Sequence, residues 1–111
     1  MIGLRGLFTG LLLASAGVAT CGAANAPPIA VSSVEVTGDQ DDCVQRASNA
    51  LKKNNFGTAF SIINNRTLNG QRGAYTAAVR CLAEKGVAFV AVAGPSTDLT
   101  EKYADAIRSG F

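Results

Sequence analysis

An uncharged, mostly apolar run, Leu7–Ala19, limits how much of this chain can form a folded domain. It follows Arg5, the only charged residue up to position 26, and it precedes a stretch of mostly small residues, Thr20–Ala26. A positive start, an apolar centre and a small-residue end are typical of a cleavable secretory signal. We therefore expect residues 1–26 to be a signal peptide and residues 27–111 to form a single small exported domain.

The apolar run is too short for a membrane anchor, because its 13 residues span about 20 Å as a helix and a bilayer core is about 30 Å thick. The longest apolar stretch after it, Val87–Ala93, has the length of a strand. We expect no transmembrane segment after the signal. Ala24-Asn25-Ala26 fits a cleavage site but places Pro27 after the cut, and earlier small residues fit as well.

Val18-Ala19-Thr20-Cys21 approximates a bacterial lipoprotein signal, with Thr where Gly, Ala or Ser is usual. Lipid attachment at Cys21 is therefore the alternative to release of a soluble domain. In either case Cys21 is removed or acylated, which explains why the chain has an odd number of cysteines.

The two cysteines that remain are Cys43 and Cys81, and an oxidising compartment favours their pairing as a disulfide. The bond would close a loop that stabilises the domain by about 4 kcal/mol in the loop-entropy description. A redox-active pair is disfavoured, because such cysteines usually stand as Cys-x-x-Cys.

Hydrophobic periodicity predicts the order β-α-β-β-β-α. Helices are expected from Asp39 to about Asn54 and from Ser96–Asp98 to Gly110. Strands are expected at residues 29–37, 58–63, 74–85 and 87–93. This order predicts an α+β fold of two layers, with a four-stranded, mostly antiparallel sheet and both helices on one face.

Two of these strands carry a further expectation. Residues 74–85 also fit a helix, but a strand turns Cys81 inward towards Cys43 and is preferred. In the first strand, Ile29 and Val31 are out of phase with Val34, which predicts a bulge or a break near Ser32-Ser33.

Residues 64–73 are polar and include Asn69-Gly70, a pair typical of tight turns, so we expect a surface loop there. Arg66, Arg72 and Arg80 lie on or beside it and predict a contact site for an acidic or glycan-bearing partner. Asn65-Arg66-Thr67 is also an N-glycosylation sequon, which matters only in a eukaryotic host.

Two polar clusters are better explained as helix caps than as ligand sites. Asp39, Asp41 and Asp42 lack the Glu that a calcium loop carries about eleven residues on. Residues 94–97 lack the glycine spacing and the lysine of a phosphate loop. We expect no metal site and no cofactor.

Charge and composition exclude some functions. After the signal the chain keeps nine basic and eight acidic residues, and it has no His. A net charge of +1 gives no basic face for nucleic acid, and the lack of His removes the commonest general base. We expect no enzymatic activity.

The expected function is that of an exported, periplasmic or secreted, non-catalytic module that binds another protein or an envelope component. The alternatives are an inhibitor or immunity-type protein of an extracytoplasmic hydrolase and a lipid-anchored accessory subunit of an envelope assembly. No pattern in the sequence indicates an oligomeric state.

Overall fold

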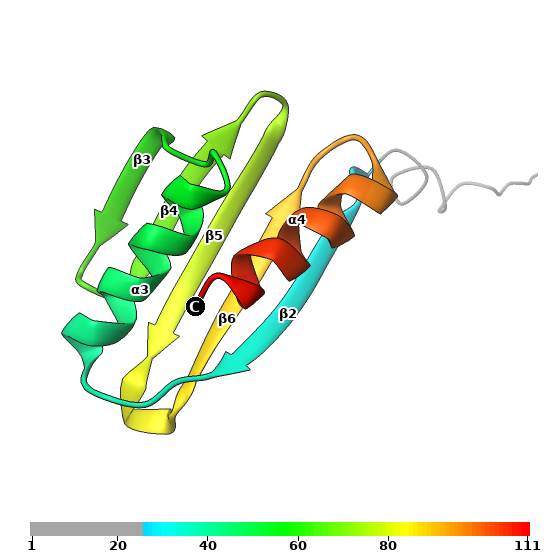
Figure 1. Ribbon diagram of the computed structural model, residues 1–111. Helices are drawn as coiled ribbons and strands as arrows, with labels where there is room; N and C mark the ends of the chain where they lie inside the picture. Colours follow the sequence, from blue (N-terminus) through cyan, green and yellow to red (C-terminus); the bar gives the residue numbers. More distant parts are fainter. Residues whose placement is uncertain (1–25) are drawn as a thin grey trace, which may run out of the picture.

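Five antiparallel strands form one sheet in the order β2-β6-β5-β4-β3. A computed structural model describes residues 26–111 (Figure 1). The strands are β2 (Ile29–Glu35), β3 (Thr58–Ile63), β4 (Thr67–Arg72), β5 (Tyr75–Leu82) and β6 (Val87–Ala93). The helices are α3 (Gln40–Lys53), the 3-10 turn η2 (Ala83–Lys85) and α4 (Thr97–Ser109). The predicted α+β class is therefore correct, whereas the predicted number of strands is too low.

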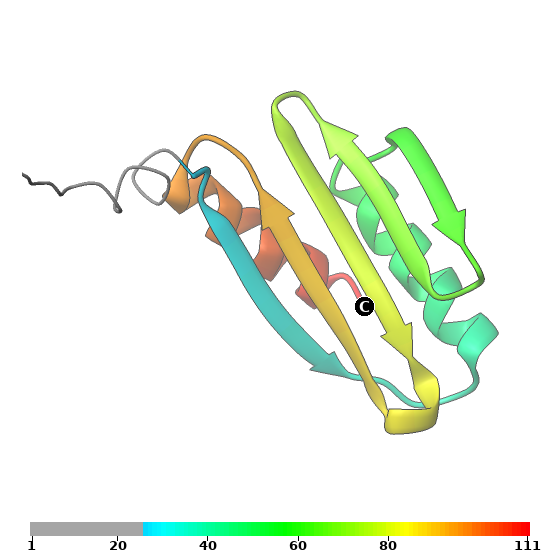
Figure 2. The same cartoon turned by 180° about the vertical axis from the view of Figure 1, so that it is seen from behind.

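Both long helices lie against the same face of the sheet, and the opposite face carries neither (Figures 1 and 2). Helix α4 packs on β2 and β6, and α3 packs on β4 and β5. The strands alternate, so that one set of side chains is buried beneath the helices and the other set points away from them. The core under the helices includes Leu51, Phe56, Val79, Val90 and Ile107, all fully buried.

The segment expected to be a polar loop forms strand β4, which corrects the sheet from four strands to five. Only Leu68 and Gly70 of this strand are buried, and its other residues are polar. A strand with one small and one large inward residue gives almost no apolar signal. The strand nevertheless pairs along its whole length with β5, from Thr67 opposite Arg80 to Arg72 opposite Tyr75.

The strand prediction for residues 74–85 is confirmed for Tyr75–Leu82, and Ala83–Lys85 form η2 at its end. Ala77, Val79 and Cys81 point inward and are fully buried. The bulge expected in the first strand is wrong, because β2 pairs with β6 one to one from Ile29 to Glu35. Ile29 and Val31, the two residues out of phase with Val34, lie on the face of the sheet that the helices do not cover.

Each long helix begins at a side-chain cap, as the sequence predicts. Asp39 accepts a hydrogen bond from the Asp42 backbone N–H at 2.8 Å, and the Asp42 carboxylate accepts one from the Asp39 N–H at 3.4 Å. Ser96 is the cap of α4 and accepts a hydrogen bond from the Leu99 N–H. The caps account for both polar clusters singled out in the sequence.

The close approach of β4 to the end of α3 yields a stability prediction. A Cβ atom at Gly70 would overlap the backbone carbonyl of Phe56, which cannot move aside as a flexible side chain can. We expect Gly70→Ala to lower the free energy of unfolding by about 3 kcal/mol. Gly57→Ala is the matched control, because its Cβ would meet only Lys52 Cγ at 4.0 Å. Urea denaturation of both variants tests this, and equal stability of the two would contradict it.

Candidate functional site

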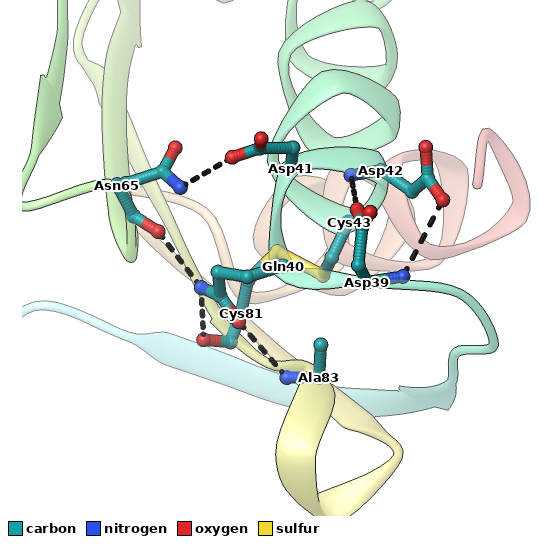
Figure 3. Close-up of a disulfide and its surroundings, with 8 residues drawn as sticks. All are labelled: Asp39, Gln40, Asp41, Asp42, Cys43, Asn65, Cys81 and Ala83. Carbon is teal, nitrogen blue, oxygen red and sulfur yellow. Dashed lines mark hydrogen bonds between the residues drawn. A yellow bond between two sulfur atoms is a disulfide. The ribbon is translucent and has the colours of Figure 1, made fainter.

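The predicted disulfide is present and joins the first turn of α3 to the end of β5 (Figure 3). The Cα atoms of Cys43 and Cys81 are 5.9 Å apart, and both side chains are fully buried. The bond therefore fastens the helical side of the domain to a central strand of the sheet.

A hydrogen-bond network around Gln40 surrounds this cross-link (Figure 3). The Gln40 side-chain nitrogen donates to the carbonyl oxygens of Asn65, at 2.8 Å, and Cys81, at 2.9 Å. Its oxygen accepts from the Ala83 N–H at 3.1 Å, and Asn65 Nδ2 donates to Asp41 Oδ1 at 2.7 Å. The start of α3 is thus tied to both the β3–β4 turn and the end of β5.

This network also bears on the sequon. Asn65 is exposed in the turn, but its Nδ2, the atom that would carry a glycan, is bonded to Asp41. Glycosylation at Asn65 stays a prediction, and it would leave Nδ2 a single hydrogen to donate. Nothing in the sequence pairs Asn65 with Asp41, since only the fold brings them together.

The three arginines do not share a loop, because the loop on which they were placed is strand β4. Arg66 lies at its start and forms an ion pair with Glu84 at 3.1 Å. Arg72 lies at its end, stacks on the Tyr103 ring of α4 and donates to the carbonyl of Asn54. Arg72 therefore belongs to the helix-covered side. Partner contact through Arg66, Arg72 and Arg80 stays a prediction.

The Arg66–Glu84 pair is an exposed surface contact. The pKa of Glu84 lies below its usual value, first because the carboxylate accepts a hydrogen bond from its own backbone N–H and second because Arg66 donates to it. Both partners are solvated, so the pair adds little to stability. It holds η2 beside the β3–β4 turn.

The face of the sheet that neither α3 nor α4 covers is called the open face (Figure 2). Arg80 points to it, because Arg80 is exposed between the buried Val79 and Cys81 of β5. Its guanidinium donates to Thr67 Oγ1 at 2.9 Å. Cross-strand pairing sets Arg80 beside Phe89, and Phe89 beside Ser33. One row of paired residues on the open face is therefore Ser33, Phe89, Arg80 and Thr67.

The neighbouring row on the open face consists of smaller side chains. Val31 pairs with Ala91, and Ala91 pairs with Ala78. Small side chains beside the larger row leave a shallow hollow of about 120 Å³. The hollow is lined by Val31, Thr67, Ala78, Val79, Arg80, Phe89, Val90 and Ala91.

Large apolar side chains are exposed around this hollow. Val31 is 69% exposed, Ile29 65% and Phe89 44%. In a strand of a sheet covered on one side, the outward positions are ordinarily polar. Here the three residues gather on the neighbouring strands β2 and β6. Two further exposed apolar residues, Ile62 and Ile63, lie on β3 at the opposite edge of the sheet.

Sequence reasoning missed this surface although it contained a signal. The out-of-phase Ile29 and Val31 indicate apolar residues on the outer face of a strand, and Val87–Ala93 is apolar on both faces. We interpreted the first pattern as a bulge, whereas it marks the open face. The second pattern fits the place of β6 between β2 and β5, and it also puts the apolar Phe89 on the open face.

The described residues, 26–111, contain no group of three or more His, Cys, Asp or Glu placed to hold a metal ion. Among their helices, none has the length and apolarity needed to cross a bilayer. The predicted signal, its cleavage position and Cys21 lie outside this range, except for Ala26. Comparison with protein-family models, curated proteins and solved structures finds no match.

The disulfide gives a prediction of its own. Replacing both Cys43 and Cys81 by Ala should lower the free energy of unfolding by about 2–4 kcal/mol. Without the bond, the unfolded chain gains conformational entropy, because two positions 38 residues apart are no longer held together. Chemical denaturation with and without reductant measures this. Reductant should destabilise the natural protein to a similar extent and leave the double variant unchanged. An unchanged midpoint for the reduced natural protein would contradict the assignment.

Proposed function

We propose that residues 27–111 form a non-catalytic binding module that acts outside the cytoplasm and contacts another protein through the open face. The observation that carries this proposal is the apolar hollow beside Phe89 on the sheet face that neither α3 nor α4 covers. A contiguous exposed apolar patch on a soluble domain commonly marks a site of interaction.

The size and chemistry of the hollow suit a single apolar side chain of a partner. At about 120 Å³ it is slightly smaller than the apolar cavity of about 150 Å³ that accommodates benzene in an engineered protein. The small side chains of Ala78 and Ala91 and the cation of Arg80 are all part of its lining. We therefore expect the partner to insert an aliphatic or aromatic residue that lies next to an acidic group.

Several properties of the chain support a location outside the cytoplasm and a non-catalytic role. The disulfide fits an oxidising compartment, in agreement with the signal expected at residues 1–26. The chain has no His, and its balanced charge suits a protein partner better than a nucleic acid.

Photo-crosslinking in the cells that make the protein tests the proposal. A benzoylphenylalanine in place of Phe89 should form a covalent adduct with a partner protein, because this position borders the hollow. The same group in place of Asp105, which is exposed on α4 behind the sheet, should form none. Adducts from position 105 and none from position 89 would contradict the proposal.

A matched pair of substitutions then tests the hollow itself. Ala78→Leu fills the hollow, whereas Thr76→Leu adds apolar bulk to the same face of the same strand outside the lining. We expect Ala78→Leu to weaken partner binding at least about fivefold, which corresponds to the loss of about 1 kcal/mol that marks an energetically important contact. Thr76→Leu should retain binding. Equal effects of the two would show that the hollow does not receive the partner.

A further inference from the structure

Within residues 26–111, strand β2 is an edge of the sheet and pairs with β6 alone (Figure 2). Half of its backbone groups point away from β6. The Val36 N–H donates to the Gly86 carbonyl, and the Gly94 N–H donates to the Pro28 carbonyl. In an antiparallel pair, hydrogen-bonded and non-hydrogen-bonded residues alternate. Because the register is one to one, these two bonds show that the N–H and C=O groups of the even-numbered residues of β2 point towards β6. The N–H and C=O groups of the odd-numbered residues, Ile29, Val31, Ser33 and Glu35, therefore point outward.

This edge lacks the features that normally prevent strand addition. Edges are commonly blunted by a bulge, a proline or a lysine. The opposite edge has such a feature, since β3 shifts register between Thr58 and Ser61 and Ala59 has a positive φ of 51°. Strand β2 is regular over seven residues and contains no Pro, Gly or Lys. It carries a single charge, Glu35, at its end.

We propose that β2 pairs with β2 of a second copy of this chain, antiparallel about a twofold axis at Ser32. In this register Ile29 lies opposite Glu35 of the second copy, and Val31 lies opposite Ser33 of the second copy. Every outward-pointing residue then meets another outward-pointing residue. Each of these pairs exchanges two hydrogen bonds, about eight in all. The result is one continuous sheet across both copies.

The side chains favour a second copy over a strand of another protein. The two Glu35 carboxylates lie at opposite ends of the interface, so no like charges face each other. On the open face, the exposed Val31 of each copy lies diagonally across the axis from Val31 of the other copy, within the range of a cross-strand diagonal contact. The two apolar hollows then share one surface. On the helix-facing side the axis passes at Ser32, a small half-buried residue that leaves room for close approach.

The pairing is independent of the proposed function, because it uses backbone groups at the edge rather than the hollow. Ser33→Pro removes an outward N–H and leaves the ladder with β6 intact, since proline is tolerated at an edge when its nitrogen faces solvent. Ser33→Lys adds a cation at the same place. Thr76→Lys is the matched control, because it adds the same cation to the open face of the central strand β5.

Sedimentation equilibrium of residues 27–111 from micromolar to millimolar concentration is the test. The natural domain and Thr76→Lys should form a dimer with similar affinity. Ser33→Pro and Ser33→Lys should weaken dimerisation roughly ten- to hundredfold, while circular dichroism confirms that they fold. A monomer at every concentration would overturn the proposal and leave the edge to a strand of another protein. A dimer that Thr76→Lys disrupts and both Ser33 variants preserve would overturn it as well.

Discussion

The covalent bond between Cys43 and Cys81 is the constraint on which the arrangement of this domain depends. A domain of about 85 residues buries only a modest core, and here that core lies entirely on one side of the sheet. The disulfide fixes the first turn of α3 to β5, and Gln40 joins the same turn to the β3–β4 turn and to η2. With α3 held in this way, α4 completes the cover over β2 and β6.

The cross-link and both long helices lie on one side of the sheet, so the side chains of the open face do not pack against them. This face is not a conventional polar surface, since the exposed Phe89 and Val31 line a hollow together with Ala78 and Ala91. A residue such as Phe89 on an outward position contributes nothing to the core of the isolated domain. Its exposed part is available for contacts with a partner, and this is the physical basis of the function that we propose for this face.

Much of the fold could be predicted from the sequence, but the candidate site could not. The cysteine pair decided correctly between strand and helix for β5, because only a strand turns Cys81 towards Cys43. Strand β4 was missed because its inward positions are Leu68 and Gly70, and a glycine required by close approach to Phe56 looks like a turn signal in sequence. The arginines were grouped by their closeness in the chain, whereas the ladder places Arg72 under α4 and Arg80 on the open face.

Hydroxyl-radical footprinting tests the central claim, that the open face is the surface covered by a partner, most directly. Side-chain oxidation is compared between the protein in its native compartment and the purified domain. Phe89 and Val31 should be protected in the native compartment, while Tyr103, half-buried between the helices and the sheet, should be oxidised equally in both. Equal oxidation of Phe89 in both samples, with protection confined to α4, would contradict the account.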